Sequence, residues 1–349
     1  RIVFASVISL GIILTAGNQP WASIPAQAQA SLASEHDELL TESNPLNPAA
    51  PEIQPASPRV TLTGVDHEWQ TWNNCGPATV SMNLSYYGNG DTQVEAAQFL
   101  KPNPDDKNVG PDELVAYVRS LGYEGMVGAG GDISLLKHLL SNGLPVIVEL
   151  WVEPEDQGGM GHYRLLTGYS EAEDQFWAYD SLHGPGITVP MDELDDAWRV
   201  FNRTFVVVFS PEAATEVHAI LGSRLDGSTM YEDALRNAQE EIEAAPEDAF
   251  AWFNAATNYA RLGEPALAAS AFDEARSVGL PHRMLWYQFE IFETYLAMGR
   301  YQEVIELTTA TLRSTGGLEE PYYYRGLARR AINQPEAAAQ DFRAALVYN

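Results

Sequence analysis

The one cysteine among the 349 residues, Cys75, lies in the segment QTWNNCGPATVSMNLSYYG. A thiol attacks a carbonyl carbon only as the thiolate, and a free cysteine titrates at about pH 8.5. Pro77 and the apolar residues after it predict a helix that begins here and ends at Gly88. The first turn of a helix offers unpaired N–H groups and partial positive charge, and both favour a thiolate. The spacing therefore predicts a cysteine with a lowered pKa, suited to nucleophilic attack.

A nucleophilic cysteine needs a neighbouring base, and histidine is the side chain that most often serves. His162 is the strongest of seven candidates because it follows a glycine-rich stretch and opens the predicted strand HYRLLTGYS. A packed or solvated histidine at a strand end is the alternative reading. His183, in the Gly-Pro turn SLHGPG, is the second candidate base. The other histidines lie in a linker, beyond a turn or in predicted helices: His36, His67, His138, His218 and His282.

Two further side chains could complete such a site. Asp180 ends the next predicted strand, QFWAYDS, and adjacent antiparallel strands place their residues side by side. Its carboxylate could therefore hold the imidazole in the required tautomer, with Asp174 in the preceding turn as a weaker candidate. Gln70 stands five residues before Cys75 and could donate to an oxyanion together with the backbone N–H of the cysteine. A surface glutamine is the alternative reading of Gln70.

The segments QTWNNCGPATVSMNLSYYG, GHYRLLTGY and AYDS together resemble the papain-like domain of the bacteriocin-processing, double-glycine-leader peptidases in its free-standing secreted form. The resemblance covers residues 61–211. It implies that Cys75 is the nucleophile, His162 the base, Asp180 the orienting residue and Gln70 the oxyanion donor. In members of the family this glutamine often precedes the cysteine by six positions, whereas here it precedes it by five. The transport and ATP-binding domains of bacteriocin exporters are absent from the sequence, so cleavage after a Gly-Gly leader is not carried over.

Residues 60–211 predict helices first and strands later. Short amphipathic helices are expected at 111–122 and 132–143, the second capped by Asp132. Runs of β-branched and aromatic residues then predict strands at 145–152, 162–170, 175–181 and 203–210. This order is typical of an α+β fold with an antiparallel sheet, which agrees with a papain-like cysteine peptidase domain. We expect the segment to form one core and to fold without the rest of the chain.

Residues 212–349 are rich in alanine and predict helices throughout. Seven positions between Trp252 and Ala275 recur 70 residues later, and a weaker copy lies between them, so the mean period is 35. A helical hairpin of about this length resembles a tetratricopeptide repeat. We expect repeats at about 249–282, 285–318 and 319–349, forming an all-α domain that binds protein, with a generic helical bundle as the alternative.

The N-terminus predicts export. Residues 1–30 combine an apolar run with the A-x-A pattern of AQAQA, as a signal peptide does, although an uncleaved anchor is also possible. Residues 31–59 carry five prolines and predict a disordered linker. The expected location is secreted, cell-surface or periplasmic. Exported proteins usually pair their cysteines, so a lone Cys75 is an inert thiol, an intermolecular link or a nucleophile.

The formal net charge of −28 would repel phosphate backbones and anionic lipid. We therefore expect neither a nucleic-acid partner nor electrostatic membrane binding. The acidic stretch NPDDKNVGPDE lacks calcium-loop spacing, and no zinc or phosphate-loop motif occurs, so no cofactor or metal is expected. The sequence predicts an exported cysteine peptidase acting on a peptide or protein. A catalytically silent peptide-binding protein and an acyl transferase with the same triad are the alternatives.

Overall fold

The computed structural model describes residues 56–103, 105–153 and 159–348. The predicted export signal, and the predicted linker up to residue 55, lie outside these residues. Strand β1 begins at Arg59, and the backbone N–H of Ser57 donates to the hydroxyl of Ser141 at 3.1 Å. The last residues of the predicted linker are therefore part of the fold. Within the described ranges, no helix combines the length and apolar character that crossing a membrane requires.

One antiparallel sheet of seven strands forms the centre of residues 56–210, as far as the chain is described. The strand order is β2-β7-β3-β4-β5-β6, and β1 pairs with β4 outside this path. Strands β3 and β7 are almost entirely apolar because helices cover both of their faces. The strands are β1 (Arg59–Thr61), β2 (Glu124–Gly128), β3 (Val146–Val152), β4 (Met160–Ser170), β5 (Gln175–Asp180), β6 (Gly184–Pro190) and β7 (Phe205–Phe209).

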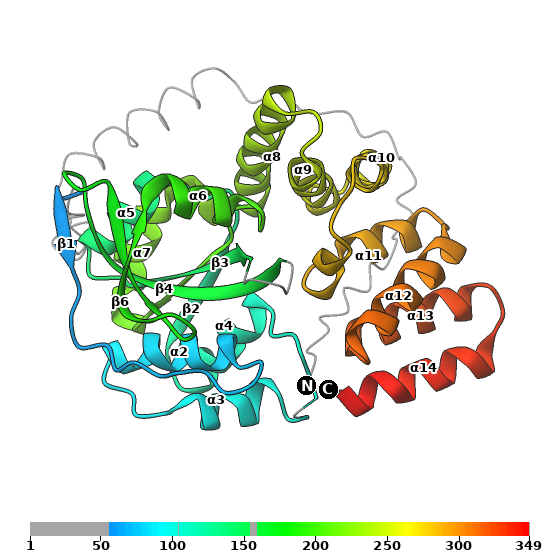
Figure 1. The fold of residues 1–349 in the computed structure, drawn as a ribbon, viewed down its shortest axis with the longest axis horizontal. Helices are drawn as coiled ribbons and strands as arrows, with labels where there is room; N and C mark the ends of the chain where they lie inside the picture. Colours follow the sequence, from blue (N-terminus) through cyan, green and yellow to red (C-terminus); the bar gives the residue numbers. More distant parts are fainter. Residues whose placement is uncertain (1–55, 104, 154–158, 349) are drawn as a thin grey trace, which may run out of the picture. The chain divides into compact units, whose positions relative to one another are not determined.

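Two helical layers cover the sheet (Figure 1). On one side, Met82 and Leu114 pack with Ile147 of β3 in a core formed with α2, α3 and α4. On the other side, Leu136 and Trp198 belong to a core formed with α5, α6 and α7. These helices are α2 (Cys75–Tyr86), α3 (Gln93–Leu100), α4 (Pro111–Ser120), α5 (Ile133–Ser141), α6 (Met191–Arg199) and α7 (Ala214–Leu221).

The predicted α+β class is confirmed for this part of the chain. The two predicted amphipathic helices are α4 and α5, and the carboxylate of Asp132 caps α5 by accepting from the N–H of Leu135 at 2.7 Å. The four predicted strands are β3, β4, β5 and β7. The sequence did not predict α3, α6, β2 and β6. Strands β2 (EGMVG) and β6 (GPGITVP) contain glycine and proline, and both lie at the edges of the sheet, where such residues are tolerated.

Residues 214–348 are helical apart from turns, which confirms the predicted all-α class. A Cβ added to Gly326 would lie 2.6 Å from Cε1 of Phe342, so only glycine fits where these two helices cross. Ala256 and Phe272, 70 residues earlier, are both fully buried. The long helix α8 (Gly227–Ala244) is followed by the pairs α9 (Ala249–Arg261) with α10 (Pro265–Ser277), α11 (Glu290–Ala297) with α12 (Tyr301–Thr315), and α13 (Glu319–Ala331) with α14 (Pro335–Tyr348); the 3₁₀ turns are η1 (Pro211–Ala213), η2 (Gly222–Leu225) and η3 (His282–Trp286).

The sheet-containing segment and the helical segment share a hydrophobic core. Trp151, Val200 and Phe201 belong to the same buried cluster as Phe253 of α9 and the helices that follow it. The described residues accordingly belong to a single compact unit. This shared core argues against the expectation that the segment ending at Pro211 folds by itself. Its apolar surface continues into the repeats, which the hydrophobic pattern of either part does not reveal.

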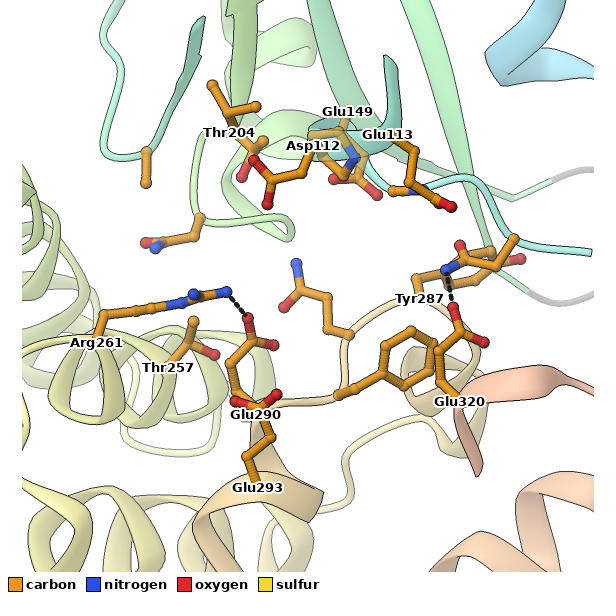
Figure 2. Close-up of a pocket in the computed structure, with 18 of the residues that line it drawn as sticks. Asp112, Glu113, Glu149, Thr204, Thr257, Arg261, Tyr287, Glu290, Glu293 and Glu320 are labelled. Atoms are coloured by element: carbon orange, nitrogen blue, oxygen red, sulfur yellow. Dashed lines mark hydrogen bonds and ion pairs between the residues drawn. The ribbon is translucent and has the colours of Figure 1, made fainter. Parts of the chain in front are cut away.

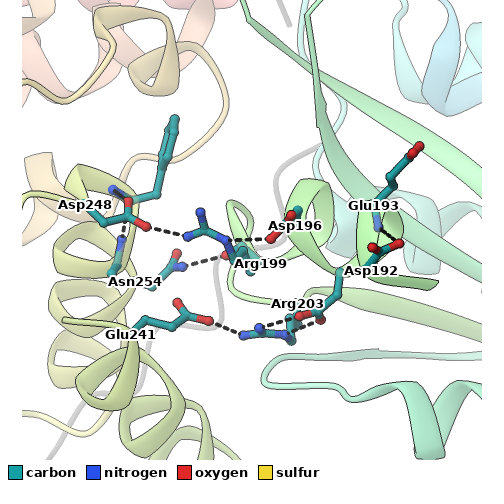
Figure 3. A network of polar contacts seen from close by, with 11 residues as sticks. Asp192, Glu193, Asp196, Arg199, Arg203, Glu241, Asp248 and Asn254 are labelled. Carbon is teal, nitrogen blue, oxygen red and sulfur yellow. Dashed lines mark hydrogen bonds and ion pairs between the residues drawn. The ribbon is translucent and has the colours of Figure 1, made fainter. Parts of the chain in front are cut away.

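Polar contacts reinforce this junction (Figure 3). Arg199 pairs with Asp248 at 2.5 Å, and Arg203 pairs with Glu241 at 2.6 Å. The α6 end of the network is fixed by two further bonds from Arg203 to Asp195, at 2.7 and 2.9 Å. Guanidinium–carboxylate pairs of this geometry are strong because both groups are charged and directional. They orient the end of α6 and the turn before β7 against the first helices of the repeats.

Candidate active site

Cys75 is the first residue of α2, as the sequence predicts. The first intrahelical bond runs from Ala78 N–H to the carbonyl of Asn74 at 2.9 Å. The N–H groups of Cys75 and Gly76 precede it, and Pro77 has none, so the helix start directs two backbone donors toward the thiol region. The Gly76 N–H also interacts with the cysteine sulfur. The helix therefore supplies stabilisation for negative charge at this position.

His162 lies on β4, between the cysteine and Asp180. Its Nε2 is 3.0 Å from Oδ1 of Asp180, and the side chains of both residues are completely buried. A carboxylate can only accept, so the proton of the imidazole is on Nε2 and the other nitrogen, Nδ1, is left for the thiol. Nδ1 is buried and makes no hydrogen bond of standard geometry within the described residues. The Cys75 thiol is close enough to interact with this ring by hydrogen bonding and by charge.

The environment shifts the pKa values of all three groups in the direction of an ion pair. Burial raises the pKa of Cys75, but the hydrogen bond and charge of His162 outweigh it, so the thiol pKa lies below its ordinary value. Burial lowers the pKa of His162, whereas Asp180 and Cys75 raise it to a net value of about 9. The pKa of Asp180 is well below its usual range because His162 and Arg164 outweigh its burial. The imidazolium stabilises both the thiolate and the carboxylate, and each of these anions stabilises the imidazolium.

Several donors hold the Asp180 carboxylate in place. Oδ1 also accepts from the N–H groups of Leu182 at 2.7 Å and His183 at 3.0 Å. Oδ2 accepts from Nε of Arg164 at 2.8 Å. The sequence motifs do not single out Arg164, although it stands two residues after His162 on the same strand, where side chains share one face. The carboxylate is thus oriented independently of the imidazole it contacts.

The rival candidates occupy other positions. His183 places Nδ1 3.1 Å from Oδ2 of Asp180 but is half exposed, and the histidine that interacts with the Cys75 thiol is His162. Asp174 is exposed in the turn between β4 and β5, with φ of 51°. His67, expected beyond a turn, places Nε2 2.9 Å from the backbone carbonyl oxygen of Asp180. Only His162 and Asp180 of these groups therefore form a buried chain that reaches Cys75.

Gln70 lies beside the cysteine and is held by Ser181. Its Oε1 accepts from the Ser181 hydroxyl at 2.8 Å, and its backbone N–H donates to the Ser181 carbonyl at 2.9 Å. Because the amide oxygen is occupied, the Nε2 group points away from Ser181. Gln70 and Cys75 line the same cleft. The side-chain amide and the N–H of Cys75 are therefore available donors in one place.

The cleft that contains these residues has a volume of about 690 Å³. Trp72, one of its lining residues, is 89% exposed. The opposite wall comes from the helical segment, through Trp286, Tyr287 and Thr315. The repeats therefore complete the cleft as well as the core.

His162, Asp180 and His183 could also be considered as metal ligands, since their ligand atoms lie within 4.8 Å of one another. The structure argues for a different use of these groups. Arg164 already places a positive charge on Oδ2 of Asp180, and His162 and two backbone N–H groups occupy Oδ1. A cation at this point would compete with all four donors.

Alkylation of Cys75 by iodoacetamide, followed against pH, should have a midpoint clearly below the value of about 8.5 for a free thiol. The cause is the positive charge of His162, so His162→Ala should move the midpoint upward. His138→Ala is the matched control because His138 lies on α5, away from the cleft. A midpoint near 8.5 that His162→Ala leaves unchanged would show that Cys75 is an inert structural residue.

Comparison with known proteins found one family model and a set of solved structures that are similar to parts of this chain. The model of the Peptidase_C39 like family matches residues 62–206. No curated protein matches the sequence. A C39-like peptidase from Bacillus anthracis is 16% identical over 44% of this chain and 98% of its own, with a TM-score of 0.36. The peptidase domain of Streptococcus ComA is 16% identical over 42% of this chain and 99% of its own, with a TM-score of 0.35.

A solved structure of another kind is also similar to part of this chain. MamA from Desulfovibrio magneticus RS-1 is 19% identical over 38% of this chain and 75% of its own, with a TM-score of 0.33. The family match covers helices α2 to α6, strands β2 to β6, the start of β7 and the Cys75–His162–Asp180 chain. Residues 62–206 are therefore similar to the Peptidase_C39 like family, and a helical segment follows them.

Proposed function

We propose that the protein is a cysteine peptidase in which Cys75 is the nucleophile, His162 the acid and base, and Asp180 the residue that orients the imidazole. The observation that supports this proposal most directly is the buried hydrogen bond between His162 Nε2 and Asp180 Oδ1, which leaves Nδ1 for the thiol. Gln70 is proposed as an oxyanion donor. A peptide carbonyl in the cleft would meet the sulfur, the imidazole and two N–H donors together.

In the first half of the reaction, the Cys75 thiolate adds to the carbonyl carbon of the peptide bond. The negative charge that develops on the carbonyl oxygen is stabilised by the N–H of Cys75 and by Nε2 of Gln70. The C–N bond then breaks as His162 donates its Nδ1 proton to the leaving amine. The amine product departs, and the acyl group remains on the sulfur as a thioester.

In the second half, neutral His162 takes a proton from water through Nδ1. The hydroxide formed adds to the thioester carbonyl, and the C–S bond breaks to release the carboxylic acid product and the thiolate. The imidazolium is regenerated, so the site returns to its initial state. The raised pKa of His162, about 9, keeps this ring protonated at neutral pH whenever the thiolate is present.

The alternatives differ in the fate of the acyl enzyme. An acyl transferase would pass the acyl group to an amine in place of water, with the same residues. A catalytically silent binding protein would have no use for a buried His–Asp pair, because burying two ionisable groups costs free energy. The intact chain of contacts therefore favours a catalyst.

We also propose, from the sequence alone, that the protein is exported and that the repeats bind protein. The structure supports a more specific role for the repeats, since Trp286 and Tyr287 line the catalytic cleft. They would contact the substrate of the peptidase rather than only a separate partner.

The test is hydrolysis of a quenched-fluorescence hexapeptide library by the full chain in H₂¹⁸O, with products identified by mass spectrometry. New carboxyl termini carrying ¹⁸O are expected, and Cys75→Ala should remove them because no other thiol exists in the chain. Chelation by EDTA should leave the rate unchanged, since the proposed steps use no metal. Products joined to an added amine would indicate a transferase, and an intact library together with an unreactive thiol would rule out catalysis.

A further inference from the structure

A second cavity, of about 450 Å³, lies where the sheet-containing segment meets the repeats (Figure 2). One side is formed by the start of α4 and by β2 and β3, and the other by the first helix of each repeat pair, α9, α11 and α13. Its lining contains one arginine, Arg261, and six carboxylates: Asp112, Glu113, Glu149, Glu290, Glu293 and Glu320. Acidic side chains therefore outnumber basic ones six to one in this lining.

Most of these carboxylates already have donors. Glu290 pairs with Arg261 at 2.5 Å, and Glu293 accepts from the hydroxyl of Tyr324 at 2.6 Å. Glu113 accepts from the backbone of Gly110 at 2.7 Å, and Oε1 of Glu320 accepts from Asn108 at 3.0 Å. Apart from Oε2 of Glu320, the fold itself supplies partners for these acids.

Glu149 is different. It lies in the middle of β3 and is only 7% exposed, yet no group in the described part of the chain donates to its carboxylate. Burial, with Cys75 and Glu290 nearby, raises the pKa of Glu149 well above its usual range. An acid placed in a core strand without a partner costs free energy, so its retention points to a ligand.

Other lining groups are unsatisfied in the same way. The Oγ1 of Thr257, the Oε1 of Gln288 and the Oε2 of Glu320 are buried without a hydrogen-bond partner in the described residues. Thr257 and Glu149 lie on opposite sides of the cavity (Figure 2). All four groups can accept hydrogen bonds, so a ligand with several donors and a positive charge would satisfy them together.

The spacing of the acids argues against a single metal ion. Among the described residues, the only group of three His, Cys, Asp or Glu side chains whose ligand atoms come within 4.8 Å of one another is His162, Asp180 and His183, outside this cavity. A volume of about 450 Å³ instead suits an extended organic cation.

The cavity also adjoins the catalytic cleft. Asn108, Glu149 and Tyr287 line both spaces. A chain bound with its carbonyl at Cys75 could therefore direct a side chain past Glu149 into the acidic cavity. This continuity favours a peptide over a free polyamine as the source of the cation.

We infer that the cavity is a substrate subsite for a basic side chain, arginine or lysine, of a peptide whose backbone lies in the Cys75 cleft, with Glu149 as the principal partner of the positive charge. The inference rests on the proposed peptidase function for the identity of the ligand. The binding site itself does not depend on hydrolysis.

The test uses the full chain with Cys75→Ala and acetylated hexapeptide mixtures that carry arginine, or its neutral isostere citrulline, at one fixed position. The fixed position differs from one pair of mixtures to the next. For one of these pairs, the arginine mixture should bind about tenfold or more tightly than the citrulline mixture, as expected for a charge-assisted hydrogen bond. Glu149→Gln should remove the preference, and Glu320→Gln should weaken it. Glu193→Gln, at an exposed acid of α6, is the control that should retain it.

Equal binding of the two mixtures at every position would overturn the inference, as would a preference that Glu149→Gln and Glu320→Gln both retain. Binding of spermidine that Glu149→Gln abolishes, with equal binding of the peptides, would assign the cavity to a free polyamine. The arginine preference without hydrolysis by the unmodified chain would support the subsite and reject the peptidase. Hydrolysis by the unmodified chain without the arginine preference would support the peptidase and reject the subsite.

Discussion

Asp180→Ala is expected to lower kcat/KM for peptide hydrolysis by up to about 10⁴-fold, the size of effect known for the equivalent acid of serine triads. Without the carboxylate, nothing selects the tautomer that leaves Nδ1 of His162 facing the thiol. The positive charge on the imidazole would also be less stable. Steady-state kinetics on the best peptide from the library would measure the loss.

This variant needs a stability measurement alongside it. Asp180 also neutralises Arg164, whose side chain is only 11% exposed, and breaking a buried pair can cost about 3–5 kcal/mol. Asp180→Asn is the gentler change, because the amide oxygen can still accept from the backbone of Leu182 and His183. Melting curves would separate lost folding from lost catalysis.

The control is Asp174→Asn, in the exposed turn between β4 and β5. Asparagine is chosen because Asp174 has φ of 51°, a left-handed conformation that alanine adopts poorly. It should leave kcat/KM nearly unchanged. Full activity in folded Asp180→Ala together with an inactive Asp174→Asn would mean that the orienting acid has been misassigned.

Ending the chain at Pro211 is expected to prevent stable folding. The deletion removes α7, whose Val217 and Leu221 are buried in the core beneath the sheet. Each such side chain contributes about 1.5–3 kcal/mol when buried. The deletion also exposes Trp151, Val200 and Phe201, which pack against the repeats. The total loss is comparable to the stability of a typical domain, about 5–15 kcal/mol.

A chain ending at Asp226 is the matched comparison, because it keeps α7 and removes only α8 and the repeats. It should be more soluble than the shorter chain but melt below the full protein, and it should lose activity because Trp286 and Tyr287 no longer complete the cleft. Circular dichroism, melting curves and peptide hydrolysis would compare the three chains. A fully stable and active chain ending at Pro211 would contradict the shared core.

The features of this protein that can be predicted from its sequence alone are local ones. Pro77 after Cys-Gly and an apolar run place Cys75 at a helix start, since the first turn is where proline is favoured. Alternation of β-branched and aromatic residues identifies β4 and β5, and the short turn between them brings His162 and Asp180 onto neighbouring strands. Such signals depend on residues close in the chain, so periodicity and turn chemistry reveal them.

Contacts between residues far apart in the chain become visible only in the folded molecule. Ser181 holds Gln70 across 111 positions, and the buried amides of Asn202 and Asn258 bond reciprocally across 56. Neither spacing leaves a periodic signal. Three other features also depend on contacts between distant parts of the chain. They are the orientation of His162 Nδ1 toward the thiol, the core shared with the repeats and the unpartnered Glu149. Burial and partner geometry settle them, because they depend on how separate elements pack and not on the order of residues within any one element.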